Sequence, residues 1–325
     1  MKINRRMRQI LLTGTAVMLL GGMWAGSVSA EETEPIQVGT LLSLGTATPL
    51  AAEQLNYFSD AGLNVEVREF ADGAAIMEAF AAGELDMALV GIAPAATWYN
   101  RGAKLQVVAG ANGGGHVVMT REDTGINTVE ELAGKLVAEP SIATVTDAML
   151  RSKILAPAGI DPNMDVTLIS GMKPADMATA LMATKEVEAM ITWEPYASLA
   201  LQNYDDIKII YDAAPEIQEE NGSEHFYPGN VLIASTDFIT EAPELLESYL
   251  AVHKQTIEYL NTDEGANALL AGLLELDESV VESARERTDF QYDLNPEAAM
   301  EILQWSVDQS YLDELPDQTE FFRQN

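Results

Sequence analysis

Hydrophobic and polar positions follow the same order in two segments that lie roughly a hundred residues apart. Residues 80–94 read FAAGELDMALVGIAP, and residues 181–195 read LMATKEVEAMITWEP. Each segment begins with the apolar end of a helix pattern and passes through a short acidic turn into an apolar strand. Each ends at a proline, which favours the first turn of a helix. The sequence therefore predicts two strands whose C-terminal ends meet helix N-termini, where open α/β sheets bind ligands.

Alternating strand and helix patterns fill most of the remaining chain, which predicts βαβ units on mostly parallel sheets. A glycine-rich break is expected at residues 112–115, a polar surface loop at 216–224, and a capping box at 128–131. Strands are predicted at 36–42, 65–70, 87–90, 105–109, 116–120, 135–138, 165–169, 188–191, 207–211 and 231–234. Helices are predicted at 49–61, 73–82, 93–101, 174–183, 195–202, 243–260, 265–274, 278–287 and 296–309, with a further helix that ends near 158.

These elements group into two blocks, and the twin segments fall one in each. We therefore expect two α/β lobes, the first built from residues 31–118 and 228–325 and the second from residues 119–227. The helices after residue 243 are expected to pack on the first lobe. Two crossings between lobes predict a two-strand hinge, which suits closure around a ligand.

The first thirty residues have the pattern of a secretory leader. Four basic residues, the last of them Arg8, precede an apolar stretch at 10–23, and small residues lead to a cleavage site after Ala30. The apolar stretch is too short to span a bilayer, so we expect residues 1–30 to be a removed signal peptide and the protein to be periplasmic. The adjacent Arg5 and Arg6 leave the twin-arginine route open. The chain has no cysteine, so lipid attachment to an N-terminal cysteine is excluded and no disulfide stabilises the fold.

Charge changes the picture of possible partners. Four of the 18 basic residues and none of the 51 acidic residues lie in residues 1–30, so the remaining chain carries a formal charge of −37. Such a surface repels nucleic acid and anionic lipid. Its simplest interpretation is a solvated acidic coat, and we expect a monomer with no nucleic-acid partner.

No pattern of catalytic or metal-binding residues is present. The three histidines do not have the spacing of zinc ligands, and there is no G-x-S-x-G, Walker A or H-E-x-x-H motif. We therefore expect no catalytic residues, metal or cofactor, and predict that the protein is not an enzyme.

Several segments, in this order and spacing, resemble a known family. They are residues 44–49, 57–63, 83–88 with 91–94, 132–140 and 192–197. They are similar to segments of the extracytoplasmic solute-binding proteins of ABC importers for nitrate, sulfonates, taurine and bicarbonate, whose relatives bind a thiamine pyrimidine precursor. The resemblance implies a type II periplasmic-binding-protein fold, with two lobes that close on a ligand and deliver it to a membrane permease and its cytoplasmic ATPase.

Two loops of the first lobe are candidate ligand contacts. Gly45 and Thr46 follow the first strand, where backbone N–H groups and a hydroxyl either bind a ligand oxygen or cap the next helix. Gly91, Ile92 and Ala93 form the matching edge at the end of a later strand, where glycine permits close backbone approach. The alternative is an ordinary tight turn.

The hinge region supplies a second group of candidates. Gly114 and His116 belong to a run of three glycines and a histidine, which either wraps a ligand or serves the hinge. Tyr227 lies at the return crossing and could offer its phenol, while the nearby Asn230 could offer an amide.

The second lobe contributes the candidates best suited to oxyanions. Ser141, Thr144 and Thr146 combine hydroxyls with the N–H groups of a helix start. Trp193 ends the second twin strand and either stacks on a ligand or belongs to the core. Glu194 either pairs with a cationic group of the ligand or charges the helix start.

The ligand itself stays open between two classes. We favour a small anion or zwitterion, with an organosulfonate such as taurine first and nitrate or bicarbonate possible. Except near the hinge, none of the candidate loops carries a basic residue, so an anion would be held by N–H groups, hydroxyls and helix ends without a guanidinium clamp. The loops equally fit a neutral or zwitterionic ligand with a stacking surface on Trp193. The alternatives are a receptor for a pyrimidine-like or aromatic compound and a ligand-sensing subunit of a membrane signalling system.

Overall fold

The computed structural model describes residues 34–215 and 227–324. The predicted leader, residues 1–30, and the predicted loop at 216–224 lie outside the described residues. No helix within 34–215 and 227–324 is both long and apolar enough to cross a bilayer.

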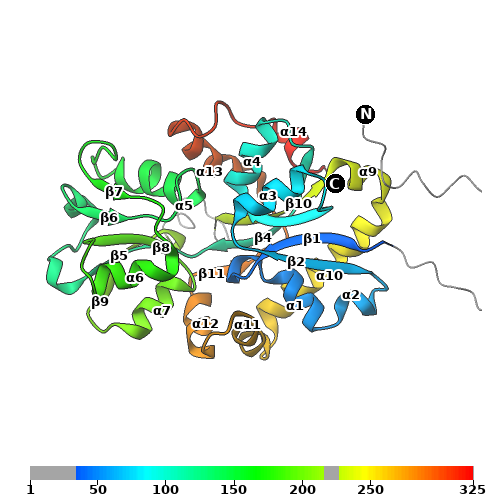
Figure 1. The fold of residues 1–325 in the computed structure, drawn as a ribbon, viewed down its shortest axis with the longest axis horizontal. Helices are drawn as coiled ribbons and strands as arrows, with labels where there is room; N and C mark the ends of the chain where they lie inside the picture. The colour runs from blue at the N-terminus through cyan, green and yellow to red at the C-terminus, as the bar shows by residue number, and fades with distance from the viewer. Residues whose placement is uncertain (1–33, 216–226, 325) are drawn as a thin grey trace, which may run out of the picture. The chain divides into compact units, whose positions relative to one another are not determined.

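The first sheet contains six strands in the order β11-β4-β10-β3-β1-β2 (Figure 1). Strand β1 pairs in parallel with β2 and β3, whereas β10 runs antiparallel to both β3 and β4. The strands are β1 (Ile36–Leu41), β2 (Val65–Phe70), β3 (Met87–Gly91), β4 (Leu105–Gly114), β10 (Pro228–Ser235) and β11 (Thr288–Phe290).

The second sheet contains five strands in the order β7-β6-β8-β5-β9 and repeats the pattern of the first. Here β6 pairs in parallel with β7 and β8, and β5 runs antiparallel to β8 and β9. The strands are β5 (His116–Arg121), β6 (Leu136–Ala138), β7 (Thr167–Ile169), β8 (Ala189–Trp193) and β9 (Ile207–Asp212). The twin segments of the sequence thus become equivalent strands, β3 and β8, in two sheets of similar topology.

Apolar helix faces cover the sheets and close their cores. The helices packed on the first sheet include α1 (Thr48–Gln54), α2 (Tyr57–Asp60), α3 (Gly73–Ala81), α4 (Ile92–Asn100), α9 (Thr236–Glu241), α10 (Pro243–Thr262), α11 (Ala266–Leu274) and α14 (Gln318–Phe321). The second sheet carries α5 (Val145–Ala148), its π-helical continuation Met149–Leu155, α6 (Pro174–Met182) and α7 (Tyr196–Asn203). Short 3₁₀ turns occur at Leu44–Thr46, Glu122–Thr124 and Val129–Leu132, the last with the predicted capping box.

Two predictions about the sheets were wrong. The sheets are mixed rather than mostly parallel, because strands that enter from the other sheet, such as β5 and β10, run against their neighbours. The glycine-rich stretch does not break the chain at residue 112, because β4 continues through it to Gly114 and pairs there with β11, a strand that the sequence did not predict.

The last helices do not pack on the first sheet alone. The helix α12 (Glu278–Arg285) contacts α7, and α13 (Pro296–Asp308) contacts both α4 and the π-helical segment Met149–Leu155 (Figure 1). The Ser152 hydroxyl donates to the Trp305 carbonyl at 3.3 Å. The C-terminal part of the chain therefore connects elements of both sheets. The lobe boundaries at 118/119 and 227/228 remain a prediction.

A glycine in β4 tests this packing. A Cβ atom at Gly110 would lie 2.5 Å from the backbone oxygen of Gln291, and Gly110 N donates to Tyr292 O at 2.8 Å. Since backbone cannot move aside as a flexible side chain can, Gly110→Ala should lower the free energy of unfolding by about 1–3 kcal/mol in urea titrations. The control is Gly272→Ala in helix α11, where nothing lies within 4 Å and alanine should be neutral or stabilising. Equal effects of both substitutions would contradict this packing.

Candidate ligand-binding site

A cavity of about 560 Å³ is lined by residues of both sheets. The ends of the twin strands β3 and β8 both reach it, as the repeated sequence pattern suggested. The first sheet and its loops contribute Leu41, Leu42, Ser43, Leu44, Gly45, Phe70, Ala71, Asp72, Gly73, Val90, Gly91, Pro94, Asn112, Gly114, Gly229, Asn230 and Thr288. The second sheet and the connection into it contribute Gly115, His116, Pro140, Ser141, Thr144, Val145, Thr146, Pro174, Trp193, Glu194 and Tyr196.

Uncharged amides and backbone form the polar part of the first wall. A Cβ atom at Gly45 would lie 2.4 Å from Nδ2 of Asn230 and 2.9 Å from Oδ1 of Asn112. Glycine is therefore the residue that lets this turn approach the two amide side chains. The Nδ2 group of Asn112 also donates to the Asp289 carbonyl at 3.0 Å, which fixes its orientation.

The second wall is a loop of hydroxyl residues, residues 141–146, at the start of α5. The Thr144 hydroxyl donates to the Ser141 carbonyl at 2.8 Å and caps the helix. Because hydroxyls both donate and accept hydrogen bonds, this wall can meet oxygen or nitrogen atoms of a solute without carrying a charge.

His116 connects this loop to the hinge. Its Nε2 atom lies 3.0 Å from the Thr146 hydroxyl, and its Nδ1 atom lies 2.5 Å from the Tyr227 hydroxyl. Burial lowers the pKa of His116 to about 4. The imidazole is therefore neutral near pH 7 and gives a solute no positive charge.

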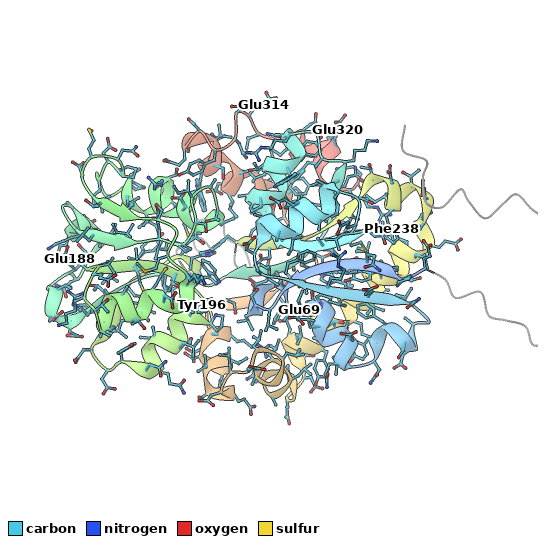
Figure 2. The ribbon with its side chains drawn as sticks, in the orientation of Figure 1. Glu69, Glu188, Tyr196, Phe238, Glu314 and Glu320 are labelled. Atoms are coloured by element: carbon cyan, nitrogen blue, oxygen red, sulfur yellow. The ribbon has the colours of Figure 1, made fainter. Side chains whose placement is uncertain are left out.

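Aromatic rings form the end of the cavity near β8. The Trp193 ring lies 6.3 Å from the ring of His116 and meets Tyr196 edge to face at 6.0 Å. Figure 2 shows Tyr196 on the side of the second sheet that approaches the first. Trp193 and Tyr196 are half-buried, so both rings offer apolar area to a solute.

A buried carboxylate lies beside these rings and is paired from outside the cavity. Glu194 Oε1 accepts from Arg287 Nη1 at 3.2 Å, and Oε2 accepts from Ser198 N at 3.0 Å. Arg287 also contacts Asp212 Oδ2 at 3.2 Å. Burial raises the pKa of Glu194, while the Ser198 amide and the Arg287 guanidinium oppose that shift.

The balance of charge excludes a guanidinium clamp in this geometry. Among the described lining residues, the ionisable carboxylates are Asp72 and Glu194, and none is a lysine or arginine. Within the described residues there is also no cluster of three or more acidic, histidine or cysteine side chains suited to a metal ion. The cavity can form hydrogen bonds and apolar contacts, and its carboxylates are already engaged, Glu194 with Arg287 and Asp72 with Ala75 N at the start of α3.

Most of the predicted site residues reach this cavity, and four do not. Those that line it are Gly45, Gly91, Gly114, His116, Ser141, Thr144, Thr146, Trp193 and Glu194. Whether they touch a ligand remains a prediction.

The other four candidates have local structural roles. The Thr46 hydroxyl donates to the Leu41 carbonyl at 2.8 Å and so closes its own turn. Ile92 and Ala93 point into the hydrophobic core at the start of α4. Tyr227 is buried behind His116, where its hydroxyl contacts the imidazole and its backbone carbonyl accepts from Gly114 N.

Sequence reasoning missed other functional candidates. Phe70, Asp72 and Tyr196 line the cavity; no motif distinguishes Phe70 or Asp72, and Tyr196 lies in the resembling segment 192–197 without having been singled out as a contact. Arg287 was missed because it lies far along the chain from Glu194, in a turn after α12. A lone arginine at a helix end gives no signal for a partner so distant in sequence.

Two lobes of α/β structure with a cavity between their sheets define a periplasmic-binding-protein fold. The periplasmic aliphatic sulphonate-binding protein SsuA of Escherichia coli superposes with a TM-score of 0.74 at 21% identity, over 90% of this chain and 92% of that one. The nitrate-binding protein NrtA of Synechocystis PCC 6803 gives a TM-score of 0.71 at 14% identity, over 88% and 84% of the two chains.

Sequence comparison identifies the family. The model of the NMT1-like family matches residues 29–275, and the chain belongs to that family. A Brucella abortus protein named only as a binding protein is 25% identical over 79% of this chain and 77% of its own length. The taurine-binding periplasmic protein of Escherichia coli is 25% identical over 59% of this chain and 56% of its own.

The ion pair at the cavity wall yields a second test. Arg287→Met leaves the buried Glu194 carboxylate without its cation. The free energy of unfolding at pH 8 should therefore fall by about 2 kcal/mol, a figure reduced for the partial exposure of the guanidinium. The loss should shrink toward low pH, because Glu194 then takes up a proton. Adding Glu194→Gln should restore most of the stability in thermal unfolding. A double variant as unstable as Arg287→Met alone would rule out the pairing.

Proposed function

We propose that this protein is the extracytoplasmic solute-binding component of an ABC importer. The observation that carries the proposal is the cavity whose walls come from two sheets joined by crossing strands. Family membership and the likeness to sulfonate-, nitrate- and taurine-binding proteins support it. The role is binding and delivery rather than catalysis, with a permease and its ATPase as partners and the periplasm as location after removal of residues 1–30.

Capture follows from closure of the two lobes, residues 31–118 with 228–325 and residues 119–227. A solute between them meets the turn at Gly45 on one side and residues 141–146 on the other. Closure expels water and strengthens each hydrogen bond, because the local dielectric constant falls. The closed monomer is the form that the permease recognises.

The lining favours a zwitterion over a simple anion. Backbone N–H groups, hydroxyls and amides suit a sulfonate or carboxylate, while Glu194 and Asp72 suit an amine at the other end of the molecule. Nitrate and bicarbonate would meet no lining cation, and would face Asp72 and a Glu194 carboxylate that Arg287 already pairs. An organosulfonate of the taurine type is therefore our first candidate.

A planar aromatic solute is the second candidate. The rings of Trp193 and Tyr196, with the neutral imidazole of His116, offer a surface on which a pyrimidine-like ring could stack. Such a solute would use the amides of Asn112 and Asn230 for its ring nitrogens and substituents.

A screen with matched variants tests the function and separates the candidates. Thermal-shift assays test five solutes: taurine, a simple alkanesulfonate without an amine, nitrate, bicarbonate and a pyrimidine. Calorimetry then measures Kd for any compound that stabilises the protein. A true ligand at a hundred times its Kd should stabilise the fold by about 2.7 kcal/mol. Trp193→Ala should weaken binding about tenfold or more without unfolding the protein, since it removes buried aromatic contact. Tyr57→Ala, which removes an aromatic ring outside the cavity lining, should leave Kd unchanged.

The role of charge is read from Glu194→Gln. This variant should weaken a zwitterion but leave a pyrimidine nearly unaffected. Binding that ignores both Trp193→Ala and Glu194→Gln would place the solute elsewhere, and the proposed function would lose its basis.

A further inference from the structure

Three charged side chains are buried together directly behind the cavity wall. Arg151 Nε donates to Asp147 Oδ1 at 2.6 Å, and Arg151 Nη2 donates to Glu139 Oε1 at 2.8 Å. The side chains of Glu139 and Asp147 are 0% exposed. We call Glu139, Asp147 and Arg151 the buried triad. None of the three lines the cavity, and the capture mechanism above does not use them.

The buried triad holds the 141–146 loop from both ends. Glu139 immediately precedes Pro140, the first lining residue of that wall. Asp147 Oδ2 accepts from Ala143 N at 2.9 Å, in the middle of the loop. Ala143 has a φ of 63°, a left-handed conformation that costs free energy in a residue other than glycine. The Asp147 carboxylate therefore stabilises a strained turn that shapes the cavity wall.

The buried triad has one carboxylate more than it has cations. Glu139 Oε1 accepts from Arg151 and from the Ser170 hydroxyl, whereas the buried Glu139 Oε2 accepts no hydrogen bond from the residues that the structure describes. A proton on Glu139 removes the imbalance, since a carboxylic acid can donate to the neighbouring Asp147.

The groups that face Glu139 act in both directions, and their net effect raises its pKa. The pKa of Glu139 is raised to about 7, because burial and the neighbouring Asp147 outweigh the lowering effects of Ser170 and Arg151. Burial acts to raise the pKa of Asp147, but hydrogen bonds from Glu139, Tyr311 and Arg151 outweigh it and lower that pKa. Tyr311, which follows α13, is itself neutral because burial and Asp147 raise its pKa. Glu139 is therefore the member that gains or loses a proton near neutral pH.

We propose that Glu139 is a positioning residue: its proton completes the buried triad and keeps the 141–146 loop in the shape that lines the cavity. When the proton leaves, two buried carboxylates compete for the Arg151 guanidinium. Asp147 is then repelled by its neighbour and holds the Ala143 turn less well. The step from loop shape to solute affinity rests on the proposed function, whereas the link between Glu139 and the loop does not.

The first experiment follows the loop without any solute. The chain has no cysteine, so Ile142→Cys, at a residue that is 57% exposed, gives a single labelling position on the loop. A pH-insensitive fluorophore there should report a transition with a midpoint near pH 7. Glu139→Gln, which keeps the shape but cannot ionise, should abolish the transition. Glu186→Gln, an exposed change of the same charge on the second lobe, should retain it. A flat titration in the parent, or a transition that persists in Glu139→Gln, overturns the proposal.

Hydrogen exchange gives a readout that needs no variant. The Ala143 amide donates to Asp147, so it should be protected from exchange while the loop is ordered. After correction for intrinsic rates, this protection should fall about tenfold between pH 6 and pH 8. A tenfold change is expected if the pKa of Glu139 differs by about one unit between the ordered and the open loop. Constant protection over this range also overturns the proposal.

Taurine then connects the loop to binding. In the parent protein the Kd of taurine should be higher at pH 8 than at pH 6. In Glu139→Gln the Kd should be the same at the two pH values. If no solute of the screen binds while the loop still titrates, the positioning role holds and the proposed function fails. If taurine binds equally at both pH values and the loop does not titrate, the function holds and the positioning role fails.

The pH dependence of the free energy of unfolding gives an independent test of the buried Glu139. The pKa of Glu139 is 4.5 in the unfolded chain and about 7 in the folded protein. Below pH 4.5 the side chain is protonated in both, and between pH 4.5 and about 7 the unfolded chain releases a proton that the folded protein keeps. The contribution of Glu139 to the free energy of unfolding therefore falls as the pH rises through that range and is constant above it. Glu139→Gln should match the parent near pH 4 and exceed it at pH 8 in chemical unfolding. A variant less stable than the parent at pH 8 would contradict a buried Glu139 charge.

Discussion

The cavity depends on the way one strand passes from the first sheet into the second. The strand β4 ends at Gly114 and β5 begins at His116, so one residue connects the two sheets. Gly115 has a φ of 88°, and a Cβ atom there would lie 2.6 Å from Thr288. Gly114 N donates to Tyr227 O at 3.0 Å, and Glu194 N donates to Gly115 O at 3.0 Å. These bonds fix the returning strand and the end of β8 to the same point, and thereby place the residues of both walls.

Electrostatics then determines what the cavity can hold. The chain has 51 acidic and 18 basic residues, and Arg151 and Arg287, which lie behind the cavity wall, are already engaged in buried or half-buried pairs. Arg287 balances Glu194, and Arg151 balances one of two carboxylates. Positive charge therefore serves to position the walls, while hydroxyls, amides and aromatic rings form their inner surface. A solute held by such a surface needs hydrogen-bonding groups and apolar area more than it needs a negative charge.

Much of the fold and part of the site could be predicted from the sequence. The twin segments gave β3 and β8 correctly, because a run of apolar residues between an acidic turn and a proline depends on local chemistry. Their ends, Gly91 and Trp193, lie at the cavity as expected. Ile92 and Ala93 were predicted to contact a ligand but point into the hydrophobic core. Sequence cannot say which residue of a strand-to-helix junction faces the cavity.

The remaining features depend on contacts between distant segments. The pairing of β4 with β11, the Arg287–Glu194 pair and the approach of Asn230 to Gly45 join residues that tertiary structure alone brings together. The buried triad was likewise invisible, because a glutamate, an aspartate and an arginine in an acidic chain are ordinary surface residues until burial is known. The structure therefore adds electrostatics and positioning to a fold that local patterns largely specify.

The central claim is that a small solute is held between the two sheets, and a crystal structure with the solute from the binding screen tests it most directly. The account predicts electron density in the cavity, with contacts to the Gly45 turn on one side and to residues 141–146 or Trp193 on the other. Density for the solute on an outer surface, or contacts to one sheet alone, would contradict it.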